Sequence, residues 1–384
     1  MCGIAGLIRP YKVTDQDLAD IDQMVESIYA RGPDASNVYK FPRVILGNTR
    51  LAITDPHNHE ANLPLTNSRV TVAYNGQIYN HTALRQELSD YDFQTHSDTE
   101  IILAAYEKWG EECFSRFEGM FAICIYDHDS GQTILARDPT GQKPLYIHES
   151  DDGIAFSSDI NSLVHNKNLE KSFDRDSIIE YLAVSFISGP NTHIREIKKV
   201  LPGHYLKIGK DAKPENNRFL DLSFDDAFQG QDKQAVTEHL KDVIDQSCQE
   251  TFNLEVPYAL LLSGGLDSTV VMMKARAAGL NLKTYSIGFE RDAPPAGHDF
   301  EANATKGSAP NGVNGINGST APADKEDVKT SNSLVLSEFQ YSDRLAEDYG
   351  TAHKKIIMTR NDYMERLRQW IDTTGEPHIT PEAP

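Results

Sequence analysis

The residue at position 2 carries the first side chain in the chain that could act as a nucleophile. If Met1 is removed, Cys2 becomes the N-terminal residue and bears a thiol and a free α-amine on the same α-carbon. An α-amine has a pKa of about 7.7 to 8.0 and a thiol one of about 8.5, so the amine can accept the thiol proton near neutral pH. One residue can therefore supply both a nucleophile and its base.

A glycine-rich segment in the second half of the chain could bind phosphate. Leu262-Ser263-Gly264-Gly265-Leu266-Asp267-Ser268 ends the nearly continuous apolar run at 256–262 and leads into a predicted helix. Adjacent glycines let the backbone approach an anion, the serine hydroxyls add donors, and a helix N-terminus favours negative charge. Because no Gly-Lys-Ser/Thr follows, the segment is not a Walker loop. The alternative is a glycine-rich turn that caps the helix.

Four segments downstream of Cys2 carry polar residues in a distinctive order. They are Arg31-Gly32-Pro33-Asp34, Asn48-Thr49-Arg50-Leu51-Ala52-Ile53, Tyr74-Asn75-Gly76-Gln77-Ile78-Tyr79-Asn80 and Ser97-Asp98-Thr99-Glu100. In order and spacing they resemble the class II glutamine amidotransferases and, within them, the glutamine-hydrolysing asparagine synthetases. Leu201-Pro202-Gly203-His204-Tyr205, Ser286-Ile287-Gly288-Phe289 and Gly375-Glu376-Pro377 extend the resemblance over nearly the whole chain.

The resemblance implies an N-terminal-nucleophile hydrolase that releases ammonia from the side-chain amide of glutamine. Cys2 would attack the amide carbon, form a glutamyl thioester and pass its proton through the α-amine to the departing nitrogen. The Asn75 side chain and the Gly76 N–H would form the oxyanion hole. From the residues alone, the alternative is that Asn75 and Gly76 form a turn.

The resemblance also assigns the groups that hold the substrate. Arg50 would bind the α-carboxylate of glutamine through its guanidinium fork, and Asp98 would bind the α-ammonium. Gln77 stands where the family usually has a glutamate near that ammonium, which weakens one charge contact. The alternatives are that Arg50 is a surface charge and that Asp98 caps the helix that begins beside it.

By the same resemblance the glycine-rich segment binds the pyrophosphate end of ATP. Aspartate would be activated as β-aspartyl adenylate, and ammonia from the first site would displace AMP. Asp267 would assist Mg²⁺, so the expected cofactors are ATP and Mg²⁺ and the expected partners are glutamine, aspartate and ATP. The predicted ATP-binding residues are Leu262, Ser263, Gly264, Gly265, Asp267, Ser268 and Ile287.

Short β-rich runs alternate with helices in the first half of the chain. The runs 70–74, 119–126 and 133–136 predict strands, and residues 99–109 predict a helix with apolar side chains at spacings of three and four. We therefore expect an α+β domain over residues 2–190, which the resemblance identifies as an N-terminal-nucleophile hydrolase with αββα layers.

After a connecting region at 191–234, helices and strands alternate over residues 235–384, which predicts an α/β domain with a parallel sheet. The expected helices are 234–252, 269–278 and 336–349, and the expected strands are 256–262, 282–287 and 355–358. Residues 291–333, rich in Gly, Pro, Ala, Ser and Asn, predict a disordered insertion. Because family members continue beyond Pro384, we expect an incomplete ATP-pyrophosphatase-type domain, truncated at its C-terminus.

Composition narrows the classes of function. Among 384 residues, 57 Asp and Glu against 37 Lys and Arg give a formal charge of −20, which disfavours nucleic acids and anionic membrane surfaces. No stretch approaches the roughly 18 apolar residues that a membrane span needs. Of the four cysteines, Cys113, Cys124 and Cys248 are expected to be buried free thiols. These features favour a cytoplasmic protein.

Three alternatives to a glutamine-dependent amidotransferase stay open. They are a stand-alone glutaminase, a related amide or lactam synthetase acting on another carboxylate, and a paralogue that binds glutamine or ATP without turnover. The presence of Cys2 favours ammonia release, whereas the chain end at Pro384 favours the paralogue. Compared with the family that the sequence resembles, Pro139 stands in place of an arginine and Asp159 in place of a glutamate. Whether the chain forms a homodimer is also open.

Overall fold

The computed structural model describes residues 2–165, 169–221, 228–252, 255–290, 335–336 and 339–377. The insertion expected at 291–333 lies outside these residues. The chain divides into two compact units. The first holds residues 1–258, 273–281 and 364–384, and the second holds residues 259–272 and 282–363.

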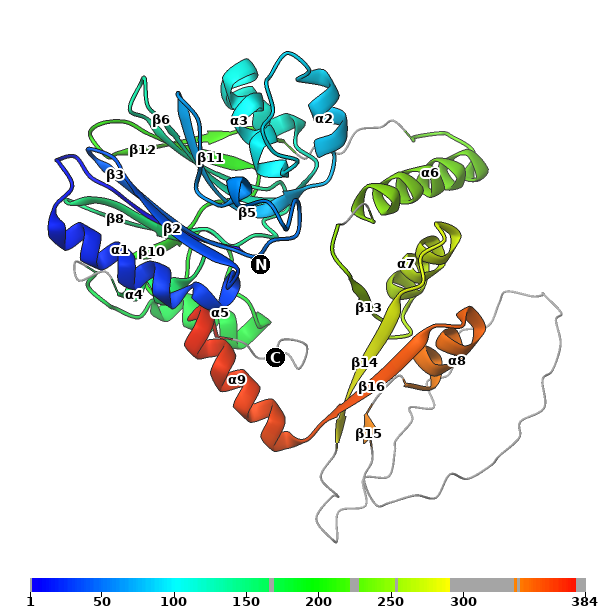
Figure 1. Ribbon diagram of the computed structural model, residues 1–384. Coiled ribbons are helices and arrows are strands. Elements are labelled where there is room, and N and C mark those ends of the chain that lie inside the picture. Colours follow the sequence, from blue (N-terminus) through cyan, green and yellow to red (C-terminus); the bar gives the residue numbers. More distant parts are fainter. Residues whose placement is uncertain are drawn as a thin grey trace, which may run out of the picture. The chain divides into compact units, whose positions relative to one another are not determined.

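The first unit is built on two six-stranded antiparallel sheets (Figure 1). One sheet has the order β10-β8-β9-β1-β3-β2, formed by Ile197–Lys199, Tyr146–Ser150, Gly153–Ser157, Gly3–Ile8, Val44–Arg50 and Ala35–Lys40. The other has the order β12-β11-β7-β6-β5-β4, formed by Pro214–Arg218, His204–Ile208, Thr133–Arg137, Gly119–Asp127, Val70–Ile78 and Leu65–Thr66.

Helices cover the outer faces of both sheets. Helix α1 packs on β1 and β3 of one sheet, α4 packs on β9 of the same sheet, and α3 packs on β5 of the other. Within residues 1–258 of this unit, the described helices are α1 (Asp15–Ser27), α2 (His81–Glu87), α3 (Asp98–Trp109), α4 (Ile160–Val164), α5 (Arg175–Val184) and α6 (Lys233–Thr251), with 3₁₀ turns at Tyr29–Arg31, His59–Ala61 and Gly110–Arg116. The expected α+β domain with αββα layers is confirmed.

The alternation of side chains along each strand explains why the layers form. In β1, Ile4 and Ile8 point into the core between the two sheets, whereas Ala5 and Leu7 pack under α1. Because successive residues of a strand face opposite sides, one run of apolar residues can fill two hydrophobic layers. This explains why the strand that follows Cys2 is apolar throughout, with all six residues buried.

The expected strands at 70–74, 119–126 and 133–136 and the helix at 99–109 are confirmed with small changes of length. The region expected to connect the domains contains three short strands, β10, β11 and β12. Strand β10 pairs with β8, and β11 pairs with β7, so these strands extend the two sheets. All four cysteines are free. Cys113 and Cys124 are buried as expected, whereas Cys248, on a helix without a fully buried residue, is only partly buried.

The second unit has a small, mostly parallel sheet. Strand β14 (Lys283–Glu290) pairs in parallel with β13 (Ala259–Leu261) and β16 (Ala352–Met358), and antiparallel with β15 (Val335–Leu336). Among the described residues the remaining helices are α7 (Leu266–Ala277), α8 (Phe339–Tyr349) and α9 (Arg360–Thr374), and most of α9 belongs to the first unit. The expected parallel sheet is confirmed. Strand β13 is shorter than the run 256–262 because Pro257 has no N–H to donate to a ladder. No helix in the described ranges is long and apolar enough to cross a membrane.

A buried ion pair fixes the start of α1 beneath the first sheet. Arg9 Nε donates to Asp17 Oδ1 at 2.7 Å, and both residues are almost fully buried. The Thr14 backbone N–H and hydroxyl donate to the other oxygen, Asp17 Oδ2. Burial opposes ionisation of Asp17, yet these hydrogen bonds outweigh it and hold the pKa of its carboxyl below the ordinary value.

Replacing this carboxylate should destabilise the first unit. Asp17→Ala leaves the Arg9 charge buried without its carboxylate, and breaking a buried pair from one side typically costs about 3 to 5 kcal/mol of unfolding free energy. Asp15→Ala, an exposed first-turn residue of the same helix, is the matched control. The lowered pKa of Asp17 stabilises the fold only at pH values where its carboxyl is ionised. The loss of unfolding free energy in Asp17→Ala should therefore shrink as the pH falls through the pKa of Asp17 in the folded chain. Urea unfolding at several pH values measures the free energy of unfolding of both variants. Equal values for Asp17→Ala and Asp15→Ala at pH 7 would contradict the prediction.

Candidate active site

Cys2 lies at the start of the central strand of the first sheet. Strand β1 pairs with β3 in the register Gly3↔Thr49, so Cys2 faces the residues that follow β3. The Leu51 N–H donates to Cys2 Sγ at 3.3 Å, and the thiol lies 3.7 Å from the Leu51 carbonyl oxygen. Strand pairing therefore holds the sulfur against one backbone segment.

The surroundings of the thiol keep it protonated. Burial raises the pKa of Cys2 above the ordinary value of a thiol, and it outweighs the Leu51 hydrogen bond and the positive charge of Arg50, which act in the opposite direction. Since the thiolate is the nucleophilic form, this sulfur needs a nearby base to react at neutral pH.

The six residues that the sequence singled out for the first site meet in one pocket of about 70 Å³. Cys2, Arg50, Asn75, Gly76, Gln77 and Asp98 all line it. A single water needs roughly 10 to 15 Å³, so the pocket suits a small ligand. Residues separated by nearly a hundred positions in sequence thus share one site.

Asn75 and Gly76 lie inside β5 and form no turn, so that alternative is wrong. Asn75 is fully buried, and its Nδ2 lies 3.5 Å from Ser158 Oγ, while its Oδ1 has no hydrogen-bond partner in the described part of the chain. A β-carbon at Gly76 would come within 2.3 Å of the Met120 carbonyl oxygen on the paired strand. Only glycine fits there, and Gly76 is among the residues that line the pocket.

Arg50 ends β3 and is buried, so it is not a surface charge. Its Nη1 donates to the Asn58 carbonyl oxygen at 3.2 Å and to Asn62 Oδ1 at 2.9 Å. Its Nη2 donates to the carbonyl oxygens of Thr54 and Asp55, each at 3.0 Å. The guanidinium therefore orders the loop that follows β3 and forms one wall of the pocket.

Asp98 is the first residue of α3, but the cap of this helix is Ser97, whose hydroxyl accepts from the Thr99 N–H. The reading of Asp98 as the cap is therefore wrong. Its Oδ2 accepts from the Tyr74 hydroxyl at 2.8 Å and from the Ile78 N–H at 3.0 Å. Burial, with the Asp98 charge adding to it, raises the pKa of Tyr74 well above the ordinary value, so Tyr74 stays a donor.

Lys143 lines the same pocket, and the sequence interpretation missed it. The residue is almost fully buried, and burial lowers the pKa of its amine although a negative charge on Cys2 would raise it. Lys143 lies between β7 and β8, far from Cys2 in sequence. No local pattern in a single sequence marks a lysine of this kind.

The glycine-rich segment of the second unit forms a loop between β13 and α7. Gly264 has a φ of +88°, and the Gly265 N–H donates to Ser263 Oγ at 3.2 Å. Ile287 lies in β14, beyond the residue that pairs with Leu261, and so stands at the same carboxyl edge of the sheet as the loop. Ligands of α/β proteins bind at this edge.

Asp267 is exposed in the first turn of α7. The described residues include no group of three or more His, Cys, Asp or Glu side chains that could hold a metal ion. Mg²⁺ usually takes one or two carboxylates together with phosphate oxygens and water. Asp267 beside the glycine-rich loop is compatible with this ligand set, in which a nucleotide would supply the phosphate oxygens.

Family models match both halves of the chain. A glutamine amidotransferase domain matches residues 1–219, more than half of the chain, and an asparagine synthase domain matches residues 239–310. The chain belongs to the glutamine amidotransferase family, as the sequence resemblance predicted.

Curated relatives carry names that agree with both domains. The chain is 33% identical to asparagine synthetase [glutamine-hydrolyzing] 1 of Bacillus subtilis over 76% of this chain and 46% of the relative. It is 27% identical to synthetase 3 of that species, over 97% of this chain and 56% of the relative. The chain thus spans about half the length of these relatives. A solved glutamine phosphoribosylpyrophosphate amidotransferase from B. subtilis matches with a TM-score of 0.43 at 18% identity, covering 76% of this chain and 66% of that one.

The raised pKa of Cys2 predicts its reactivity. In a chain that retains Met1, alkylation of Cys2 by iodoacetamide should be slow at pH 7 and should keep accelerating with pH beyond 9.0, because the thiolate fraction still grows there. Peptide mapping by mass spectrometry isolates Cys2 from the other cysteines, and N-acetylcysteine supplies the reference rate. A rate that levels off below pH 9 would show that burial does not control this thiol.

Proposed function

We propose that the first unit hydrolyses glutamine to glutamate and ammonia. The observation that carries this proposal is the pocket shared by Cys2, Arg50, Asn75, Gly76 and Asp98. After removal of Met1, the free α-amine of Cys2 takes the thiol proton as Sγ attacks the amide carbon of glutamine. The tetrahedral intermediate then expels ammonia, which leaves with the proton that the amine returns. Water hydrolyses the thioester to glutamate and restores the thiol.

The oxyanion of this intermediate needs fixed donors. The Gly76 N–H and the Asn75 amide line the pocket beside Cys2, and Asn75 is buried within a strand. Donors held in this way stabilise the transition state without reorganisation, because β5 has already oriented them.

The α-amino and α-carboxylate groups of glutamine would bind at the opposite charges of the pocket. Asp98 uses Oδ2 for Tyr74 and Ile78, so we assign Oδ1 to the substrate ammonium. Arg50 uses both Nη atoms for the loop after β3. We therefore assign its Nε, with the charge of the guanidinium, to the substrate carboxylate in place of a bidentate fork. Gln77, nearly buried in β5, would add a neutral contact.

We also propose that ammonia from this site aminates an aspartate activated by ATP. The names of the relatives, glutamine-hydrolysing asparagine synthetases, support the amination, and the family resemblance supports the activation by ATP. ATP would bind at the Ser263–Ser268 loop with Mg²⁺ at Asp267, where the glycine backbone and the start of α7 favour phosphate. The free cysteines suit a reducing, cytoplasmic location. Light scattering would test whether the chain forms a homodimer.

A glutaminase assay tests the first half of the proposal. The chain that begins at Cys2 should release glutamate from glutamine, and Cys2→Ala should abolish this release because it removes the nucleophile. Asn75→Ala should lower kcat about 10²- to 10³-fold, the usual effect of losing an oxyanion donor. Cys248→Ala, which lies outside the pocket, is the matched control.

The outcomes separate the competing functions. Glutamate release by Cys2→Ala at the unaltered rate, or none by the unaltered chain, would contradict the glutaminase proposal. Glutamate without asparagine, in the presence of ATP and aspartate, would identify a stand-alone glutaminase or a synthetase for another carboxylate. Binding of glutamine or ATP without turnover would identify a non-catalytic paralogue.

Nucleotide binding tests the second half separately. Gly264→Ala should abolish binding of Mg-ATP, since its β-carbon would come within 2.6 Å of Tyr341 Cβ at a φ of +88°. Gly279→Ala also places a side chain at positive φ, +79°, but meets nothing within 4 Å, so it should bind as the unaltered chain does. Isothermal titration measures both affinities, with glutaminase activity reporting that the first unit is intact. Equal affinities of the two variants would exclude the loop as the ATP site.

A further inference from the structure

A buried serine links the strand of the nucleophile to Asn75. Ser158 directly follows β9 and is fully buried. Its N–H donates to the Ile4 carbonyl oxygen at 2.9 Å, and its Oγ accepts from the Ile4 N–H at 3.0 Å. Ile4 lies two residues after Cys2, so Ser158 is fixed to the strand that carries the thiol.

The hydrogen bonds of Ser158 and Asn75 leave two buried groups unmatched. Because Ser158 Oγ accepts from Ile4, its hydroxyl proton still needs an acceptor, and the Asn75 side-chain amide lies 3.5 Å away. When Asn75 Nδ2 faces Ser158, both this amide and the Ile4 N–H donate to Ser158 Oγ, and the hydroxyl proton has no acceptor. Asn75 Oδ1 meanwhile has no partner within the described residues. Buried polar groups are nearly always paired.

A half-turn of the Asn75 amide resolves both mismatches. Oxygen and nitrogen of an amide have nearly the same shape, and their assignment follows from the hydrogen-bond network. With Oδ1 facing Ser158, the hydroxyl donates to it, and Nδ2 takes the position of the orphaned atom. The 3.5 Å separation is long for this bond, and the soft terminal torsion of asparagine allows it to shorten.

We propose that Ser158 is a positioning residue for the oxyanion hole. Its hydroxyl donates to Asn75 Oδ1 and thereby holds Nδ2 toward the Cys2 pocket. This inference rests on the proposed glutaminase function and deepens it. The unpaired donor at Nδ2 is then the group that awaits the oxyanion, in agreement with the usual design of such holes, in which donors are oriented before charge develops.

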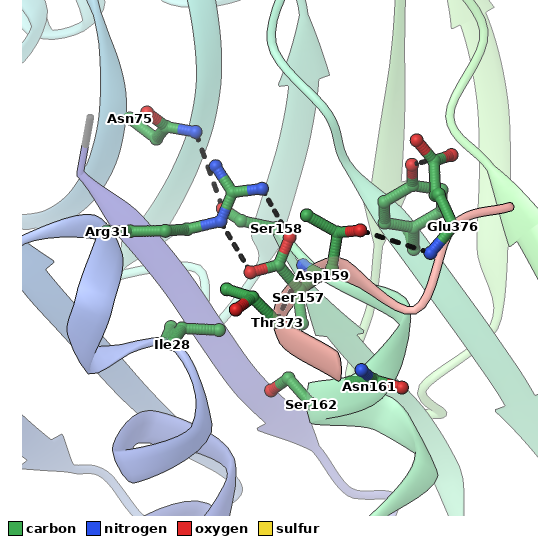
Figure 2. Close-up of polar contacts among 12 residues, drawn as sticks. Ile28, Arg31, Asn75, Ser157, Ser158, Asp159, Asn161, Ser162, Thr373 and Glu376 are labelled. Carbon is green, nitrogen blue, oxygen red and sulfur yellow. Dashed lines mark hydrogen bonds and ion pairs between the residues drawn. The ribbon is translucent and has the colours of Figure 1, made fainter. Parts of the chain in front are cut away.

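The neighbouring serine, Ser157, has different contacts and does not share this role. Ser157 is equally buried and also bonds to Ile4, but its Oγ donates to the Ile4 carbonyl oxygen at 3.2 Å and accepts from the Asp159 N–H. Asp159 in turn forms an ion pair with Arg31. Figure 2 shows the contact between Asn75 and Ser158 beside this ion pair. Ser157 therefore supports the strand end, whereas Ser158 contacts the amide.

Paired alanine variants test the proposal. Ser158→Ala should lower kcat for glutamine hydrolysis on the order of 10-fold, less than the loss of the donor itself, with KM nearly unchanged. Ser157→Ala removes the same atom from an equally buried site and should keep kcat within about 2-fold of the unaltered chain, because it leaves the oxyanion donors in place. In the background of Asn75→Ala, Ser158→Ala should cause no further loss, since both changes act through one amide.

Three kinetic results would overturn the proposal. They are equal losses of kcat in the two serine variants, a full additional loss in the Asn75→Ala background, and an increase in KM with kcat unchanged. Neutron diffraction of the unaltered chain gives a test without turnover, because it should show the deuterons of the Asn75 amide on the side away from Ser158. Deuterons facing Ser158 would overturn the inference. An inactive unaltered chain would instead overturn the glutaminase function, and the neutron map would still decide the orientation.

Discussion

Strand β1 has hydrogen-bonded neighbours on both sides, and the site depends on this double pairing. On one side β3 brings Leu51 to the sulfur of Cys2. On the other side the end of β9 brings Ser158 to Ile4. The first residues of a chain usually fray because little holds them. Here the ladder removes that freedom from the residues after Cys2, so a side chain beside the first residue of β1 can be as well placed as one in the interior.

The packing of one sheet on the other provides the remaining half of the site. Strand β5 lies in the second sheet, and its contacts with β1 and β3 bring Asn75 and Gly76 toward Cys2. The same strand receives Asp98 from α3 through Tyr74 and Ile78. Sites on strands are more precise than sites on loops. The exception is the wall made by Arg50, where four hydrogen bonds give a loop the rigidity that a ladder gives a strand.

How far the sequence could predict this arrangement depends on what each residue binds. Cys2, Asn75, Gly76 and Asp98 stood in short motifs with a family order, so the sequence located them, but it could not separate a cap from a ligand at Asp98. The cap could be excluded only by the contact of the Ser97 hydroxyl with the Thr99 N–H, which the folded chain supplies. Ser158, Lys143 and the Leu51 N–H act across sheets or through backbone atoms, and no local pattern reports such contacts. The short strands β10 to β12 were missed since their polar residues carry little alternation.

Burial of Cys2 has a cost and a benefit that belong together. A thiol with a raised pKa is a poor nucleophile, but it is also protected from oxidation and from indiscriminate alkylation, because both require the thiolate. In the proposed mechanism, a base attached to the same α-carbon would restore reactivity toward a substrate in the pocket, because the proton can then pass to the leaving nitrogen. Under the proposed mechanism the removal of Met1 would then switch on the site without any change of fold, since the strand ladder that holds the sulfur begins at Gly3.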